Sequence, residues 1–252
     1  MVFSSLPFLF LFLTVVLLVS HLLPFKFRNF FLLLANLVFY AYGEPVYVLI
    51  MIASILVNFF AGVLMDKQPT QSRRRAVLVV GIVLNLAALG VFKYAGLFVD
   101  TLRGIPAFSS LPEVNIALPI GISFYTFQAV SYLIDVYWDD CEASHNFVNF
   151  ACYISLFPQL IAGPIVRYRD VNEQLVSRHE TPTLFNSGVR LFMVGMAKKV
   201  LLANQFGMLW ESVSADPVAA GAIGAWVGAC AYTLQIYFDF AGYSDMAIGM
   251  GA

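Results

Sequence analysis

Long windows without a charged residue constrain this chain more than any other feature. No Asp, Glu, Lys or Arg occurs in six stretches, 1–25, 29–43, 45–65, 76–92, 114–134 and 217–238. A membrane-spanning helix needs about 20 mostly apolar residues, and most of these windows approach or reach that length. Only 12% of the residues are charged, against about 25% in soluble domains. The sequence therefore predicts an all-α, multi-pass membrane protein, which we treat as one domain over residues 1–252.

Basic loops between the windows indicate how the chain is oriented. Residues 66–75 read DKQPTQSRRR, and residues 24–28 read PFKFR. Because Lys and Arg accumulate in cytoplasmic loops, we place both loops in the cytoplasm and the N-terminus outside. The first span is expected to stay uncleaved, since its basic residues follow the apolar run and do not precede it as in a signal peptide. The expected spans are 1–23, 29–42, 46–65, 76–98, 116–138 and 217–237.

Two further segments are expected not to cross the bilayer. Residues 143–166 lack formal charge, but Pro158, Gly163 and Pro164 interrupt the helix, and a crossing would put the arginines that follow outside. We expect a re-entrant segment, which implies a funnel because non-helical backbone at membrane depth needs protein or water around it. Residues 184–205 are typical of an amphipathic helix at the cytoplasmic interface.

Polar side chains recur along the expected span 116–138. Gln128, then Ser131 or Tyr132, then Asp135 are three to four residues apart and should share one helix face. They form either the polar wall of a pathway or interhelical hydrogen bonds that hold helices together. The candidate channel residues from this segment are Ser123, Tyr125, Gln128 and Asp135.

The stretch FPQLIAGPIVRY at 157–168 ends the expected re-entrant segment, and Gly163-Pro164 forces a turn. Gln159 and Arg167 flank that turn. Arg167 either helps to form a cytoplasmic entrance for an anionic donor, such as a coenzyme phosphate, or anchors the chain at the interface. Gln159, Gly163, Pro164 and Arg167 are therefore further channel candidates.

A third stretch, QIYFDFAGYSDMAIGMG, occupies residues 235–251. Asp239 and Asp245 are about 1.7 turns apart if helical and would point to different faces, so they are not a ready acid/base pair. The glycines of the stretch permit close helix packing, which leaves open a packed helix end with hydrogen-bonded acids. Asp239, Tyr243 and Asp245 complete the channel candidates.

Several function classes find no support in the sequence. The net charge is −1 and there is no basic stripe for nucleic acid. The three cysteines, Cys141, Cys152 and Cys230, have no metal-ligand spacing. His21, His145 and His179 belong to no catalytic pattern. We therefore assign no metal site, no bound cofactor and no catalytic residue within the chain.

Three segments together, LPIGISFYTFQAVSYLIDVY, FPQLIAGPIVRY and QIYFDFAGYSDMAIGMG, resemble the membrane-bound O-acyltransferase (MBOAT) family, in particular its bacterial branch that O-acetylates alginate. The resemblance covers essentially the whole chain. It implies tilted and re-entrant helices around a funnel. It also implies an O-acetyltransferase of the bacterial inner membrane that takes an acetyl group from cytoplasmic acetyl-CoA. The acceptor would be an exported polysaccharide such as alginate, or peptidoglycan, and the partner a periplasmic acetyltransferase.

One feature departs from the resemblance. The family's catalytic histidine lies in a Trp-Arg-Arg-Trp-His type stretch downstream of the FDFxGYSD motif, and no histidine of this chain matches it. We expect the chain to be the N-terminal part of an MBOAT-type domain and inactive alone, because it lacks the general base that would activate an acceptor hydroxyl. A transporter or flippase and an accessory subunit of a polysaccharide-modifying complex are the alternatives.

Overall fold

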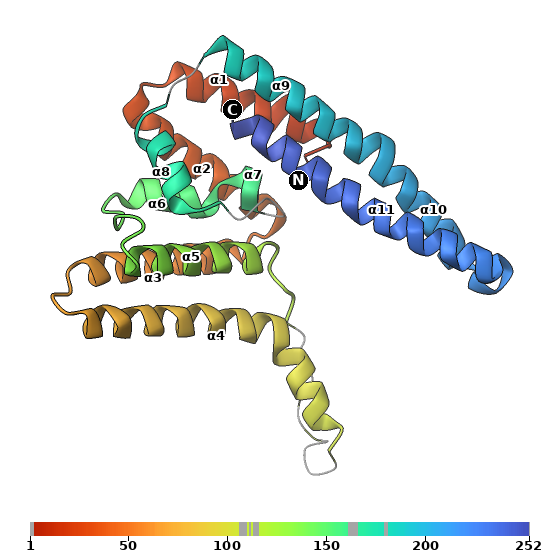
Figure 1. Cartoon of the computed structure of the whole chain (residues 1–252), viewed down its shortest axis with the longest axis horizontal. Helices are drawn as coiled ribbons and strands as arrows, with labels where there is room; N and C mark the ends of the chain where they lie inside the picture. Colours follow the sequence, from red (N-terminus) through yellow and green to blue (C-terminus); the bar gives the residue numbers. More distant parts are fainter. Residues whose placement is uncertain are drawn as a thin grey trace. The chain divides into compact units, whose positions relative to one another are not determined.

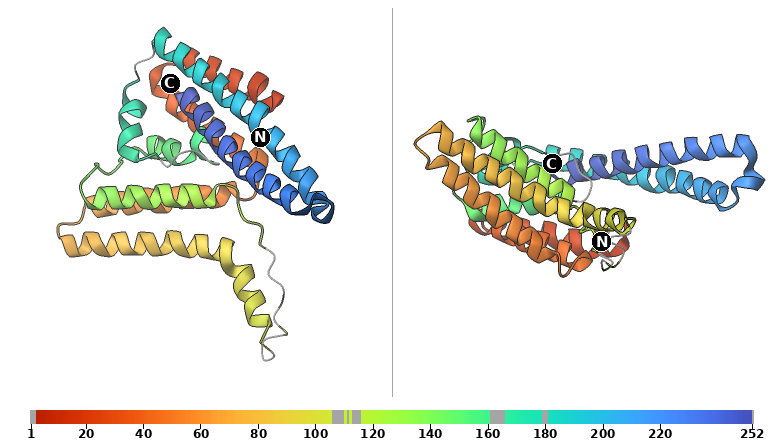
Figure 2. Two further views of the ribbon diagram at one scale, coloured as in Figure 1. Left: turned by 45° about the vertical axis from the view of Figure 1, so that its right-hand side comes forward. Right: turned by 90° about the horizontal axis from the view of Figure 1, so that it is seen from below.

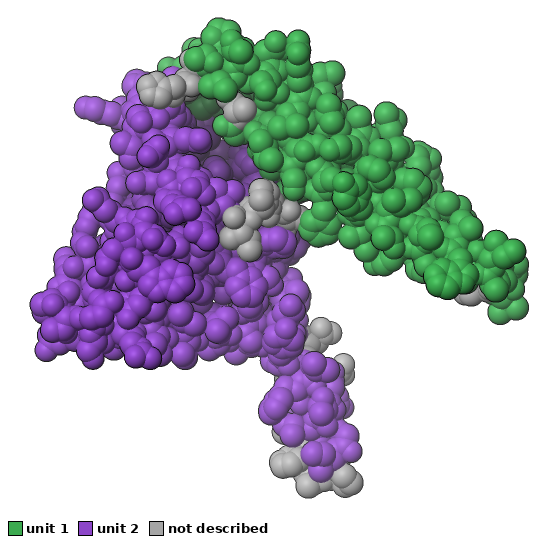
Figure 3. All heavy atoms as spheres, in the orientation of Figure 1, with its two compact units in different colours: residues 1–22, 162–164, 179–252 green, residues 23–161, 165–178 purple. Residues whose placement is uncertain are grey.

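The computed structural model describes residues 3–105, 110, 112, 116–160, 166–178 and 181–251. Within these ranges every regular element is a helix. The described residues form two compact units, which are coloured separately in Figure 3. Unit 1 comprises residues 3–22 and 181–251, and unit 2 comprises the described residues between 23 and 178. The expected all-helical membrane fold is confirmed, and whether both units belong to one domain stays a prediction.

Unit 2 begins with three long helices, visible in Figure 1. They are α2 (Phe25–Gly43), α3 (Val48–Asp66) and α4 (Gln71–Arg103). The turn between α2 and α3 starts at Glu44, where the expected Gly-Glu-Pro turn lies. Helix α4 changes direction before its C-terminal end, as Figure 2 shows.

Four shorter helices complete unit 2. They are α5 (Ile122–Tyr137), α6 (Phe147–Ser155), α7 (Phe157–Leu160) and α8 (Tyr168–Val176). The N-cap of α6 is Asn146, whose side-chain oxygen accepts hydrogen bonds from the backbone N–H groups of Val148 and Asn149. Such a cap satisfies donors that the first helical turn leaves unpaired.

The core of unit 2 is aromatic. The Tyr132 ring from α5 lies 4.7 Å from the Phe150 ring of α6 and 5.1 Å from the Tyr168 ring of α8, and Tyr153 lies 5.1 Å from Tyr168. All four side chains are buried. Edge-to-face and tilted ring pairs at these separations stabilise a core beyond the area that they bury, so α5, α6 and α8 are held together around one aromatic cluster.

Amide side chains also join the long helices. Asn58 of α3 and Asn85 of α4 are buried and exchange two side-chain hydrogen bonds, of 3.0 and 2.8 Å. Polar side chains in apolar helices commonly associate in this way. In the first turns of α4, Arg74 binds Asp139, just after α5, at 2.6 Å and also donates to the Val136 carbonyl. This pair ties the start of α4 to the end of α5.

Unit 1 is dominated by two long antiparallel helical runs, which lie side by side in Figures 1 and 2. One run consists of α9 (Pro182–Ala197), the π-helix η3 (Lys198–Ala203) and α10 (Asn204–Ala215), and the other is α11 (Pro217–Gly251). The amino-terminal part of the unit has the π-helix η1 (Pro7–Leu13) followed by α1 (Thr14–Leu22).

Glycines allow the two runs of unit 1 to approach closely. A Cβ atom added at Gly195 would lie 2.5 Å from the Gly242 carbonyl oxygen, and one at Gly249 would lie 2.6 Å from the Gly188 oxygen. Within each run the two glycines are seven residues apart, at 188 and 195 and at 242 and 249, so they fall on one face of their helix. Small residues at a seam let helix backbones meet without side chains between them.

The helices differ in extent from the expected spans. Three are long and apolar enough to cross a membrane among the residues described: Val48–Asp66, Gln71–Arg103 and Val218–Gly251. The expected first span appears as the shorter helical run Pro7–Leu22. Helix α5 begins at Ile122 where the span was expected from residue 116, because Gly121 adopts a left-handed φ of 77°. The expected interfacial helix 184–205 is part of a longer run, since α10 continues it to Ala215.

Gly121 should not tolerate a side chain. A Cβ atom there would lie 2.5 Å from the Leu160 carbonyl oxygen, and the positive φ disfavours any L-residue. We expect Gly121→Ala to lower the free energy of unfolding by about 2–4 kcal/mol, from backbone strain and overpacking together. Thermal unfolding in detergent micelles measures the change. Gly90→Ala is the matched control, because nothing lies within 4 Å of that site in α4. The control should leave the free energy of unfolding unchanged or raise it. Equal effects of the two substitutions on that free energy would show that position 121 does not require glycine.

The Arg74–Asp139 pair should make stability pH-dependent. The Arg74 guanidinium lowers the pKa of the Asp139 carboxyl, so the pair stabilises the fold above the ordinary Asp value of about 3.9. That contribution is lost as the pH falls through the lower folded-state pKa. We expect thermal stability to fall more steeply below about pH 4 in the native protein than in Asp139→Asn. Asn suits the left-handed φ of 61° at this position, so the comparison isolates the charge. Identical pH profiles would show that the pair contributes nothing.

Candidate functional site

The first of two polar clusters lies in unit 2, where the helix breaks at Leu156. This residue has φ −56° and ψ 110° and separates α6 from α7. In an unbroken helix the Phe157 N–H would donate to the Tyr153 carbonyl, four residues earlier. It donates instead to Oδ1 of Asn36 in α2, at 3.2 Å. The break therefore leaves the Tyr153 carbonyl without its helical partner.

Two glutamines bind that carbonyl. Gln128 Nε2 from α5 donates to the Tyr153 oxygen at 3.1 Å, and Gln159 Nε2 from α7 donates to the same oxygen at 2.7 Å. Both side chains are buried. The structure thus brings together two residues that were predicted separately, and a single backbone oxygen joins them.

Asn36 is a site residue that the sequence reasoning missed. Its side chain is fully buried, and its amide nitrogen lies 3.4 Å from Ser155 Oγ and 3.7 Å from Cys152 Sγ. An asparagine within an apolar stretch of helix was the available signal, because a buried amide must find partners. The partners themselves lie in α6, far along the chain, and could not be predicted from the sequence around Asn36.

The predicted polar face of α5 is confirmed. Gln128, Tyr132 and Asp135 are all buried, as is Tyr125, whereas Ser123 is half-buried. The Tyr132 hydroxyl accepts a hydrogen bond of 2.9 Å from the Ser144 N–H. Gln128 and Tyr132 therefore bind protein groups, as the interhelical alternative expected. Whether the face also lines a pathway stays a prediction.

Asp135 differs from its neighbours on that face. Its residue is 4% exposed, and its Oδ2 atom has no hydrogen-bond partner among the described residues. Arg167 and Arg169 act on the carboxylate as opposite charges, and Asp140 and Asp170 as like charges. A buried carboxylate oxygen with unused bonding capacity can accept a hydrogen bond from a ligand or from water. Asp135 is thus a predicted channel residue with capacity left for chemistry.

Arg167 lies in extended backbone directly before α8 and is exposed. The preceding residue is fixed by Tyr153, whose hydroxyl donates to the Val166 carbonyl at 2.9 Å. The aromatic core therefore positions the segment that carries Arg167. The predicted residues Gly163 and Pro164 lie outside the described ranges.

The second polar cluster lies in unit 1, where α11 carries Asp239, Tyr243 and Asp245. Lys198 Nζ contacts Asp245 Oδ2 at 2.5 Å, and Lys199 Nζ contacts Asp239 Oδ1 at 2.7 Å. The two aspartates therefore have separate partners, in line with the prediction that they point to different faces. Both lysines were predicted only as polar residues of an interfacial helix. Their pairing depends on which helix lies beside them.

Tyr243 packs against the amino-terminal part of unit 1. Its ring stacks on that of Phe3, with centroids 4.7 Å apart and planes 18° apart. Stacking fixes the ring of a residue that was predicted as a channel candidate. Whether Tyr243 contacts a substrate stays a prediction.

Cysteine and histidine chemistry finds little support. Burial raises the pKa of the Cys141 thiol to about 11, so it is not a thiolate at neutral pH. His145 contacts Asp66 at 3.1 Å, with both side chains largely exposed, and His179 lies outside the described ranges. The described residues contain no group of His, Cys, Asp and Glu that could hold a metal ion.

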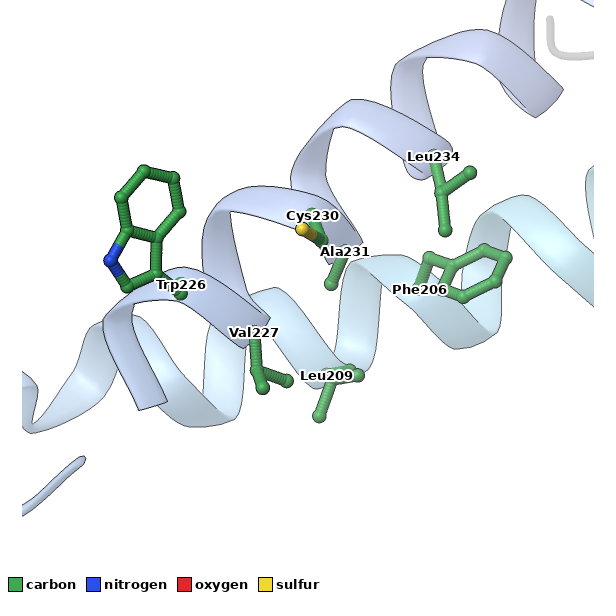
Figure 4. Close-up of a pocket in the computed structure, with 7 residues that line it drawn as sticks. All are labelled: Phe206, Leu209, Trp226, Val227, Cys230, Ala231 and Leu234. Carbon is green, nitrogen blue, oxygen red and sulfur yellow. The ribbon is translucent and has the colours of Figure 1, made fainter. Parts of the chain in front are cut away.

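An apolar depression of about 320 Å³ lies between α10 and α11, and Figure 4 shows its lining. The side chains come from both helices, and none carries a charge. They are Phe206, Leu209, Trp226, Val227, Cys230, Ala231 and Leu234. None of the predicted channel residues lines the depression, and its lining offers no group for acid/base catalysis.

Comparison with known proteins shows which family these features resemble. Residues 142–251 match the membrane-bound O-acyltransferase family, MBOAT. The chain is 44% identical over its whole length to a probable alginate O-acetylase, AlgI, of Pseudomonas aeruginosa, and 45% identical to that of Azotobacter vinelandii, covering 49% and 51% of those proteins. It is 30% identical, over 89% of its length, to a peptidoglycan O-acetyltransferase of Helicobacter pylori, covering 48% of that protein.

The chain thus spans about half the length of the curated relatives that it matches. The match includes α6, α7 and α8 of unit 2 and nearly all of the two long runs of unit 1. Both polar clusters therefore contain residues from the matched region. Together with the three long apolar helices, these similarities identify the chain as a multi-pass membrane protein whose residues 142–251 match the membrane-bound O-acyltransferase family.

Proposed function

We propose that the chain contributes to the transfer of acetyl groups at the bacterial inner membrane, from acetyl-CoA in the cytoplasm to hydroxyl groups of an exported polysaccharide. The observation that carries the proposal is the 44% identity, over the whole chain, to a probable alginate O-acetylase. In the reaction the thioester C–S bond breaks and an ester C–O bond forms. The hydroxyl proton ends on the coenzyme thiol. A periplasmic acetyltransferase is the partner that this route requires if the acetyl group is relayed beyond the membrane.

The polar interior of unit 2 supports this proposal. A charged donor that reaches into a membrane protein needs polar groups at depth, since ionisable groups in lipid are costly. Asp135 supplies a carboxylate oxygen with free bonding capacity, and Arg167 supplies an exposed cation in the same unit. Arg167 would bind a phosphate of the acetyl donor, and Asp135 would accept a hydrogen bond from another group of the same donor molecule.

Alginate and peptidoglycan are both acceptors of related proteins. The greater identity to the alginate O-acetylases favours alginate, and the 30% identity to a peptidoglycan O-acetyltransferase supplies the second candidate. Membranes containing the protein expressed from its native gene should transfer radiolabel from acetyl-CoA to alginate as an alkali-labile ester. Transfer to peptidoglycan alone would select the second acceptor. No transfer to either, with acetyl-CoA left intact, would contradict the proposal.

Arg167 should govern donor affinity more than turnover. Because one exposed charge–phosphate contact contributes about 1 kcal/mol, Arg167→Gln should raise the KM for acetyl-CoA about three- to tenfold with kcat little changed. Arg167→Lys should recover part of the affinity, and added salt should narrow the difference. The control is Arg169→Gln, in the first turn of α8, because the Arg169 side chain already pairs with Asp170 at 3.4 Å. An equal KM change for both variants would remove Arg167 from the donor site.

A further inference from the structure

Asp239 and Asp245 are placed symmetrically about a close contact of the two runs of unit 1, at Gly242. Each is three residues from Gly242, so at about 100° per residue they lie about 60° to either side of it around α11. A Cβ atom at Gly242 would lie 2.8 Å from the Gly195 oxygen and 3.1 Å from the Lys199 nitrogen. The carboxylates therefore flank the line along which the backbones meet.

The opposite run carries the matching pattern. Lys198 and Lys199 follow Gly195 by three and four residues, which places them on either side of the same line. They open the π-helix η3, where hydrogen bonds span five residues and the turn is wider than in an α-helix. The pattern Gly-x-x-Lys-Lys on one run thus meets Asp-x-x-Gly-x-x-Asp on the other, and each lysine reaches its own aspartate.

All four charged side chains are partly shielded from solvent. Their exposed fractions are 34% for Lys198, 21% for Asp245, 22% for Lys199 and 41% for Asp239. The pairs hold their carboxylates by short, charge-assisted contacts.

We propose that Lys198 and Lys199 are positioning residues that fix the rotation and register of α11 against the opposite run. Asp239 and Asp245 then act as ion-pair partners and not as acid/base groups. The inference rests on the proposed acyl transfer only for its activity readout. Its physical basis is the paired geometry at the glycine contact.

The two roles predict opposite results in double variants. Removing one partner leaves a shielded charge uncompensated, whereas replacing both by neutral side chains is commonly close to neutral. Asp245→Asn or Lys198→Met alone should therefore disturb the register, and the two together should restore it. If Asp245 takes part in proton transfer, the double variant stays as inactive as Asp245→Asn.

The experiment uses the protein expressed from its native gene, in membranes, with every native cysteine replaced by alanine, Cys141, Cys152 and Cys230 included. Register is read from the yield of a bifunctional thiol cross-link between cysteines introduced at Phe206 and Phe238, whose rings are 6.0 Å apart. Acetyl transfer to alginate is measured in parallel, as kcat and KM. Each single variant should lose at least fivefold in cross-link yield and in kcat. The double variant, and Lys198→Asp combined with Asp245→Lys, should regain at least half of both.

Arg190→Gln is the matched control, because Arg190 is an exposed cation of α9 in the same run and should leave both readouts unchanged. The proposal would be overturned if Asp245→Asn kept the wild-type register but lost acetyl transfer, and the double variant did not recover that transfer. It would also be overturned if the register were unchanged in every single variant. If the unmodified protein transfers no acetyl group, the proposed function fails, while the cross-link yields still decide the positioning role.

Discussion

A peptide group without a hydrogen-bond partner is the constraint on which the interior of unit 2 depends. In an apolar surrounding such a group costs several kcal/mol, and the break at Leu156 creates two of them, the Phe157 N–H and the Tyr153 carbonyl. Asn36 satisfies the first, and Gln128 and Gln159 satisfy the second. Because these side chains come from α2, α5 and α7, one irregular residue fixes how three helices must converge.

In unit 1 the corresponding constraint is that a charged side chain in apolar surroundings needs a partner of opposite charge. A lone carboxylate on an otherwise apolar helix is unfavourable, and each of the two on α11 has a lysine within 2.7 Å. The pairs require the backbones to be close, and the glycines at 195 and 242 provide that approach. Packing and electrostatics therefore depend on each other here. A side chain at the glycine contact would separate the ion pairs, and an unpaired charge would force the helices apart.

Features that depend on the periodicity of a single helix could be predicted from the sequence. Contacts between two helices could not. The three- to four-residue spacing on α5 predicted the face that buries Gln128, Tyr132 and Asp135. Pro158 predicted an interruption, but the break falls at Leu156, because proline is tolerated in the first turn of the helix that follows. The roles of Asn36, Lys198 and Lys199 were not predictable, since each depends on a partner at least 40 residues away along the chain.

The polar residues of the three segments that resemble the family thus fall into two groups. In one group the hydrogen-bonding or ion-pairing capacity is already used by protein partners, and in the other it is not. The amides of Gln128 and Gln159 and the carboxylates of Asp239 and Asp245 are engaged with protein partners that the fold requires. A group engaged in this way can shape a site, but it can exchange a proton or bind a donor only by giving up a contact that holds helices together. Asp135, with a buried oxygen that has no partner among the described residues, and the exposed Arg167 carry no such cost. Chemistry in this part of the protein is therefore better sought at the end of α5 and the start of α8 than along the more conspicuous acids of α11.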